Sequence, residues 1–438
     1  MKSARTLAVQ ALTKADVDDA YSTLSLSSVL RQSPDLTTAD KALVTALVYG
    51  VTQRRLTLDH TLSLYLPKPL QKLHPTVLSA LRVGAYQILF MDKIPASAAV
   101  NESVKTVKTS GCAYAAGLVN AVLRKVAANG LVLPPETDTL RRLSAEYSCP
   151  TELTQKYIDW FKTETAEEIL RVSLLPRPVF LRVNTCRTTA ADLQAQLSGE
   201  GADASICALD GALRLDRPGD LTRTKAYAQG LFHVQDLSSQ QTVKLLDLTP
   251  GQTFTDLCAA PGGKTFTAAE YLQNEGKVLS FDVYPHKCKL IEDGARRLCL
   301  SVVTPVLSDA RAAASHISEA DAVLCDVPCS GLGVIGRKPE IKYKDLAALS
   351  ELPPLQYEIL CAGAGIVKPG GTLVYSTCTL NPAENGDVCD RFLREHPDFT
   401  LADDEGYRGV CTGSYMTVIP SENGGDGFFA AKFKRKQA

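Results

Sequence analysis

Residues 253–265 read TFTDLCAAPGGKT, in which the short stretch TFTDL leads into a glycine-rich turn. We predict a strand over 253–257. The turn at Pro261-Gly262-Gly263 lets the backbone approach a ligand without a side-chain clash, and Lys264-Thr265 begins a helix. The same order of strand, turn and helix recurs downstream, and this recurrence decides the fold of the C-terminal half.

Four further apolar runs end near acidic or hydroxyl residues. They predict strands at Lys277–Asp282, Val302–Leu307, Ala322–Asp326 and Thr372–Ser376, with helical stretches between them. Strands that alternate with helices at this spacing indicate a doubly wound parallel sheet, so we expect an α/β, Rossmann-like domain from residue 236 to 438. Residues 428–433 predict a late strand, antiparallel at or near the sheet edge.

The glycine-rich turn suits a nucleotide-like cofactor. Gly-Lys-Thr also suggests a phosphate-binding P-loop, but that motif needs glycine where Cys258 stands. The dinucleotide pattern Gly-x-Gly-x-x-Gly is absent as well, and an ordinary tight turn is the plain alternative. Asp282, Asp309 and Asp326 then follow at successive strand ends, where carboxylates can bind ribose hydroxyls. A single aspartate there is more often a helix cap, but the series favours an adenosine-bearing cofactor such as S-adenosylmethionine.

Two cysteines stand at neighbouring strand ends, in DVPCSG (326–331) and STCT (376–379). Cytosine C5 is a poor nucleophile, and a thiolate that adds to C6 activates it for methylation. That chemistry also needs an acid near N3 and a base for the C5 proton. Cys378, Cys329, Asp326 and the nearby Lys264 are the candidate catalytic residues. The alternative is that both thiols are inert packing residues.

Composition places the chain among globular proteins of two or three domains, with 438 residues, 45% hydrophobic and 22% charged. We expect no secretory signal, no membrane span and a cytoplasmic location. Thirteen cysteines without Cys-x-x-Cys spacing argue against a zinc site, so no metal is expected. Residues 1–130 carry a net charge of +7 and the remainder −8, which suggests a polyanionic partner for the front half.

The front of the chain, residues 4–127, predicts a bundle of about five to seven helices. Asn129-Gly130 and Pro134-Pro135 mark its end. We divide the chain into a helical domain (1–130), a small α+β linker domain (131–235) and the methyltransferase-like domain (236–438). Trp160 and Phe161 are expected core anchors of the linker region.

The motifs of residues 236–438 resemble those of the RNA cytosine-C5 methyltransferases of the Nol/Nop/Sun family. The matching stretches are 256–265, 326–331, 375–379 with 381–385 (NPAEN), and 426–429 (DGFF). The resemblance implies that Cys378 attacks C6 and Cys329 assists product release, whereas DNA cytosine methyltransferases attack with the Pro-Cys thiol. Val327 departs from the alanine usual in that family. The resemblance also implies S-adenosylmethionine contacts by Cys258, Ala259, Ala260, Pro261, Gly262, Gly263, Lys264, Asp282, Asp309 and Asp326.

Residues 4–127 resemble the antitermination factor NusB, an RNA-binding helical domain, in the stretches 4–12, 47–51 and 119–124. The fused architecture resembles the bacterial Sun/Fmu type of the family, which implies one cytosine of 16S ribosomal RNA as substrate, in free or early-assembly RNA, and a monomeric enzyme. Basic residues Arg337, Lys338, Lys342 and Lys344 are candidates for phosphate contacts. Two alternatives stay open: the same chemistry on tRNA or another rRNA site, and a non-catalytic RNA-binding factor.

Overall fold

The computed structural model describes residues 3–18, 22–217, 219–402 and 415–437. The chain forms two compact units, one of residues 1–174 with 338–344 and one of residues 175–337 with 345–438. Within the described ranges no helix is long and apolar enough to cross a membrane.

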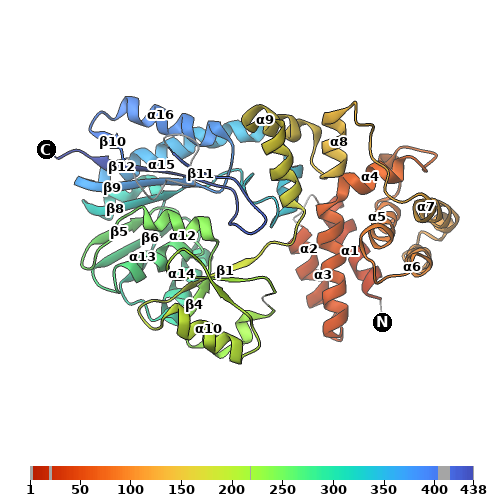
Figure 1. Ribbon diagram of the computed structural model, residues 1–438, viewed down its shortest axis with the longest axis horizontal. Coiled ribbons are helices and arrows are strands. Elements are labelled where there is room, and N and C mark those ends of the chain that lie inside the picture. Colours follow the sequence, from red (N-terminus) through yellow and green to blue (C-terminus); the bar gives the residue numbers. More distant parts are fainter. Residues whose placement is uncertain (1–2, 19–21, 218, 403–414, 438) are drawn as a thin grey trace. The chain divides into compact units, whose positions relative to one another are not determined.

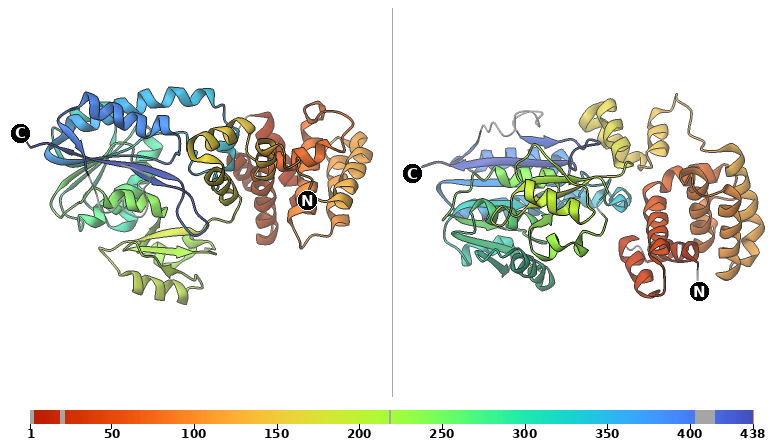
Figure 2. Two further views of the ribbon diagram at one scale, coloured as in Figure 1. Left: turned by 45° about the horizontal axis from the view of Figure 1, so that its top comes forward. Right: turned by 60° about the horizontal axis from the view of Figure 1, so that its bottom comes forward.

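The first unit is helical (Figure 1). Its α-helices are α1 (Ala4–Val17), α2 (Ser22–Arg31), α3 (Thr38–Gln53), α4 (Arg55–Ser63), α5 (Pro75–Phe90), α6 (Ala96–Thr109), α7 (Ala116–Asn129), α8 (Thr139–Glu146) and α9 (Thr151–Ser173). Leu47, Leu58, Leu81 and Leu123 belong to one apolar core that α1–α7 share, and Figure 2 shows these helices packed around it. The expected helical bundle is confirmed. Trp160 and Phe161 are only half-buried, because Tyr157 fills the interior position of α9 instead.

The segment Lys338–Lys344 belongs to this helical unit although it follows the Pro-Cys motif in sequence. It forms a 3₁₀ turn (Pro339–Tyr343). The ammonium group of Lys342 is buried and donates to the carbonyl of Gln53 at 3.0 Å, and Tyr343 donates to the carbonyl of Thr52 at 3.0 Å. Burial lowers the pKa of Lys342 to about 8. Lys342 therefore cannot be the phosphate contact that we expected.

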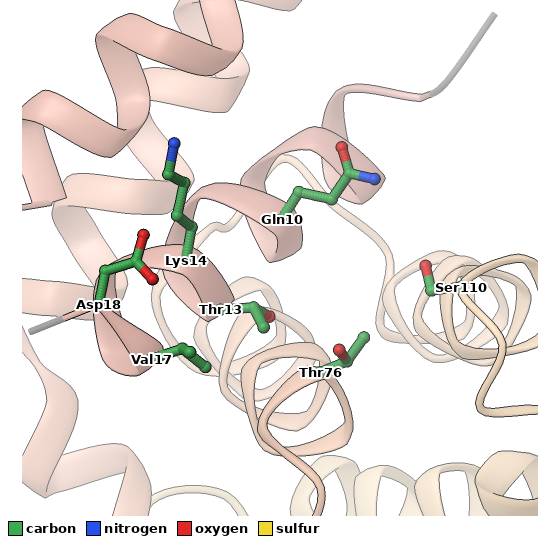
Figure 3. A pocket seen from close by; sticks show the side chains of 7 residues that line it. All are labelled: Gln10, Thr13, Lys14, Val17, Asp18, Thr76 and Ser110. Atoms are coloured by element: carbon green, nitrogen blue, oxygen red, sulfur yellow. The ribbon is translucent and has the colours of Figure 1, made fainter.

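A hollow of about 370 Å³ also lies in the helical unit (Figure 3). Its lining combines residues of α1 with the start of α5 and the turn after α6: Gln10, Thr13, Lys14, Val17, Asp18, Thr76 and Ser110. None of these is a candidate site residue, and the single lysine and single aspartate give the hollow no charge preference.

The second unit begins with a small antiparallel sheet. Its strands are β1 (Val179–Val183), β2 (Ser205–Ile206), β3 (Ala212–Leu215) and β4 (Phe232–Val234), in the order β2-β3-β1-β4. Helices α10 (Ala190–Gly199) and α11 (Lys225–Ala228) lie between them in sequence. Arg182 of β1 is buried and bonds Glu270 at 2.7 Å, which ties this sheet to the larger domain.

The larger domain contains one mixed sheet in the order β10-β12-β9-β8-β5-β6-β7, with β11 paired to β12. The strands are β5 (Thr253–Asp256), β6 (Lys277–Asp282), β7 (Val303–Leu307), β8 (Ala320–Asp326), β9 (Val367–Thr377), β10 (Phe399–Leu401), β11 (Met416–Val418) and β12 (Phe428–Arg435). Strands β5 to β9 pair in parallel, and β12 runs antiparallel beside β9. The Rossmann-like fold is confirmed, as is the late antiparallel strand.

Helices cover both faces of this sheet (Figure 1). Helices α15 (Leu352–Ile366) and α16 (Gly386–Glu395) pack on one face, and α12 (Leu237–Lys244), α13 (Gly263–Tyr271) and α14 (Pro285–Leu298) pack on the other. Burial on both faces explains why the strands read as continuous apolar runs rather than as alternating patterns. Asp256, Asp282 and Asp326 are the last residues of β5, β6 and β8.

Candidate active site

The predicted site residues meet at one edge of the large sheet. Strands β9, β8, β5, β6 and β7 are neighbours in that order, and parallel strands present their carboxyl ends at the same edge. The register aligns Asp326 with Ser376 and Asp256 with Leu324, so the two cysteine motifs and the glycine-rich loop start side by side.

The glycine-rich loop turns at Gly262, where φ is +112°. A Cβ atom there would lie 2.4 Å from the ring of Phe266, so both backbone conformation and space require glycine. Asp256, the last residue of β5, holds the loop in place, because its carboxyl accepts a hydrogen bond from Thr265 Oγ1 at 2.8 Å. Burial, with the nearby charge of Asp326, raises the pKa of Asp256 to about 7.

Asp282 and Asp309 follow β6 and β7, as expected. Asp282 is buried and accepts from the backbone N–H of Tyr284 at 3.0 Å. Asp309 is more exposed and pairs with Arg311 at 2.8 Å, and hydrogen bonds from Arg311 hold the pKa of Asp309 below its usual value. Carboxylates in this row provide acceptors for the hydroxyls of an adenosine, and the backbone at Gly262 turns without a side chain. The donor set therefore fits the cofactor that the sequence suggests.

Lys264 and Asp326 form an ion pair at 2.7 Å, and Ser376 Oγ donates to the other oxygen of Asp326 at 2.7 Å. Burial alone would lower the pKa of Lys264, but the charge of Asp326 and the hydrogen bond between them raise it above its ordinary value. The ammonium group also lies 5.1 Å from the ring centre of Phe428. Lys264 is therefore a fixed cation that Asp326 holds in its charged form.

The two thiols are in contact. Cys329 Sγ and Cys378 Sγ lie 3.3 Å apart, within hydrogen-bonding distance for sulfur. The hydrogen bond with Cys378, burial, and the charges of Glu384 and Asp326 raise the pKa of Cys329 well above its usual value. Cys329 therefore keeps its proton at neutral pH.

Sequence reasoning missed a buried hydrogen-bond framework beneath the cysteines. It centres on Glu384, which accepts hydrogen bonds from Ser330, Gln356 and Asn381, and Ser330 in turn bonds Thr379. The quoted NPAEN stretch contained Glu384 and Asn381, but nothing local showed that they would reach the other cysteine loop.

Arg337 is likewise not a surface phosphate contact. It donates to Asp426, part of the DGFF stretch, and to Asp236 at 3.3 Å. Arg177 lies 3.6 Å from the same Asp426 and donates to the carbonyls of Gly424 and Gly425. Lys338 and Lys344 are exposed. Across the described ranges, no group of three or more His, Cys, Asp or Glu side chains could hold a metal ion.

Comparison with protein families gives three matches along the chain. Residues 243–434 match the model described as 16S rRNA methyltransferase RsmB/F, residues 2–128 match the NusB family, and residues 150–222 match the ferredoxin-like domain of RsmF/B-like methyltransferases.

Comparison with curated proteins and solved structures covers nearly the whole chain. The probable ribosomal RNA small subunit methyltransferase B of Bacillus subtilis is 38% identical over 99% of this chain and 99% of its own. The protein of the same description from Synechocystis is 33% identical, over 99% of this chain and 100% of its own. The crystal structure of PH0851 is similar in fold, with a TM-score of 0.82, 25% identity and 99% of each chain covered.

The order of domains, the match to the methyltransferase model and the full-length identity agree with one another. The chain therefore belongs to the ribosomal RNA small subunit methyltransferase B family, an RNA methyltransferase with a NusB-type helical domain and a ferredoxin-like domain before its catalytic domain.

Proposed function

We propose that this protein methylates C5 of one cytosine in 16S ribosomal RNA, with S-adenosylmethionine as the methyl donor and Cys378 as the nucleophile. The observation that carries the proposal is the contact between Cys329 and Cys378 at 3.3 Å, beside the Lys264–Asp326 ion pair. The relatives' names support ribosomal RNA of the small subunit as the substrate class.

In this proposal Cys378 adds to C6 of the cytosine, which places electron density on C5. The Lys264–Asp326 pair supplies a fixed positive charge near the ring, which stabilises the negative charge that develops there. Lys264 also favours the thiolate of Cys378, because a nearby cation stabilises the ionised sulfur. After methyl transfer a base removes the proton from C5 and the bond between Cys378 and C6 breaks, which returns Cys378 as a thiolate. Cys329 assists this release of the methylated base.

The cofactor fits the row of strand ends. The loop from Cys258 to Lys264, with Asp282 and Asp309, would hold an adenosine, and S-adenosylmethionine supplies an electrophilic methyl group when it is bound. The protein's part is to orient that methyl group toward C5 and to exclude water. The target base must leave its stack to reach Cys378, which favours an unpaired or flipped cytosine.

We further propose that the NusB-type helical domain contributes RNA affinity through its net charge of +7 over residues 1–130. Lysine and arginine contacts to phosphate give such binding a strong salt dependence. In this view the protein acts as a cytoplasmic monomer on free or early-assembly rRNA.

Bisulfite sequencing of 16S rRNA and tRNA from a deletion strain, with complementation by wild type and by Cys378→Ala, tests the proposal. We expect one 16S cytosine to lose its methyl group, and only the wild-type gene to restore it. Loss of methylation in tRNA alone would identify tRNA, rather than 16S rRNA, as the substrate. Unchanged methylation in every RNA would refute the enzymatic role.

A further inference from the structure

Glu384 is a buried carboxylate that has no cationic partner among the residues that the structure describes. Its side chain accepts four hydrogen bonds, all from neutral groups: Ser330 Oγ at 2.6 Å, Ser330 N at 2.9 Å, Asn381 Nδ2 at 2.9 Å and Gln356 Nε2 at 3.0 Å. The residue is fully buried. Burial of an ionised carboxylate costs free energy, and neutral side chains could form a similar hydrogen-bond network at a lower cost. The charge of Glu384 therefore calls for a role that a neutral side chain could not fill.

The four bonds join the two cysteine loops. Ser330 directly follows Cys329, and Thr379 directly follows Cys378. Ser330 Oγ donates to Glu384, and Thr379 Oγ1 lies 2.7 Å from that same Ser330 Oγ. Gln356 of α15 donates to Glu384 and also to the carbonyl of Pro328 at 2.9 Å. The side chain of Glu384 therefore holds the neighbours of both thiols, Ser330 directly and Thr379 through Ser330.

The charge of Glu384 also acts on Cys329. It is one of the causes that raise the pKa of Cys329, after the hydrogen bond with Cys378, burial and the charge of Cys378. The loop of Cys329 bonds directly to this carboxylate through Ser330, whereas the charge of Cys378 is one of the causes that raise the pKa of Lys264.

We propose that Glu384 is a positioning residue for both thiols: its carboxylate ties the loop of Cys329 to the loop of Cys378, and its charge places the single shared proton on Cys329 so that Cys378 is the sulfur that attacks. This inference rests on the proposed function for its biological meaning. The distribution of the proton between the sulfurs, however, can be measured without RNA.

The test is the pH dependence of alkylation of each cysteine by iodoacetamide, followed by mass spectrometry on the full-length protein. In the wild type we expect Cys378 to react faster than Cys329 between pH 6 and 8. In Glu384→Gln we expect the ratio of the two rates to fall about tenfold, which corresponds to one pKa unit of proton affinity between the sulfurs. Because the two thiols titrate as a pair, the ratio is the informative quantity rather than either midpoint.

Two variants separate charge from packing. Ser330→Ala removes a hydrogen bond to Glu384 and the link to Thr379 but keeps the charge, so we expect it to retain the preference for Cys378. Glu395→Gln makes the same chemical change at an exposed glutamate of α16 and should match the wild type. Binding of S-adenosylhomocysteine, measured by calorimetry, checks that each variant is folded.

A merely structural role would raise both alkylation rates together without changing their ratio, and this result in Glu384→Gln would overturn the proposal. If Glu384→Gln does not fold, the wild-type protein still tests the proposal. Equal alkylation rates at Cys329 and Cys378 across pH 6–8 would overturn the proposal as well. In turnover assays Glu384→Gln should lower kcat at least about tenfold with little change in KM for RNA. A changed ratio in a protein that methylates no cytosine would refute the proposed function and leave the role of Glu384 standing.

Discussion

The turn at Gly262 allows a prediction whose size follows from the coordinates. In Gly262→Ala the new Cβ meets two penalties. A φ of +112° is unfavourable for alanine by roughly 1–3 kcal/mol. A separation of 2.4 Å from the Phe266 ring forces overpacking that costs about 1–3 kcal/mol more. The free energy of unfolding of the second unit should therefore fall by about 2–6 kcal/mol.

For a unit of this size the change corresponds to a decrease in Tm of about 4–24 °C, which scanning calorimetry measures directly. Gly263→Ala is the matched control, because that glycine has an ordinary φ and its nearest neighbour would be Gln235 at 3.6 Å. The double variant Gly262→Ala with Phe266→Leu removes much of the ring. It should recover only the part of the Tm decrease that comes from overpacking against Phe266. A Tm of Gly262→Ala within about 2 °C of the wild type would refute the reasoning.

Three further predictions follow from the site and the helical unit. Cys378→Ala should abolish 5-methylcytosine formation while S-adenosylhomocysteine still binds, and Cys329→Ala should accumulate a protein–RNA adduct that survives denaturing gels; absence of the adduct would count against the assigned roles. Because the pKa of Asp256 is raised to about 7 in the folded state, folding binds a proton between about pH 4 and 7, so this group's contribution to stability is lost as pH rises through 7. Asp256→Asn should flatten that dependence, and thermal unfolding at pH 5 and pH 8 would show an unchanged slope if the assignment were wrong. Glutamate substitutions at the exposed Arg124 and Lys125 of α7 should weaken RNA binding and reduce its salt slope by about 0.7–0.9 for each phosphate that is no longer neutralised, whereas a slope equal to the wild type would remove these residues from the interface.

The parallel sheet could be predicted because its signals are local. Each strand is an apolar run that stops at a polar residue, and the observed β6 has the predicted bounds Lys277–Asp282. The candidate site could be predicted for the same reason, since Cys329, Cys378 and Asp326 occupy the ends of neighbouring strands. Chain order and parallel pairing were enough to bring them together.

What could not be predicted depends on contacts between segments far apart in sequence. Lys342 and Arg337 read as a basic surface, yet one is buried against Gln53 and the other bonds Asp236 and Asp426. Helical spacing alone could not tell Tyr157 from Trp160 as the buried aromatic of α9. Glu384 is 54 residues from Ser330, and only the folded sheet brings them into contact.

The return of the chain to the helical unit at Lys338–Lys344 has a consequence for biosynthesis. About 160 residues separate this segment from the rest of that unit, which ends at Leu174. At a translation rate of roughly 5–20 residues per second, the nascent N-terminal helices wait about 8–30 s before Lys342 and Tyr343 can be supplied to them. The helical unit therefore cannot complete its fold until a large part of the second unit has been translated. Expression of residues 1–174 alone would give a helical bundle that lacks the buried side chains of this segment.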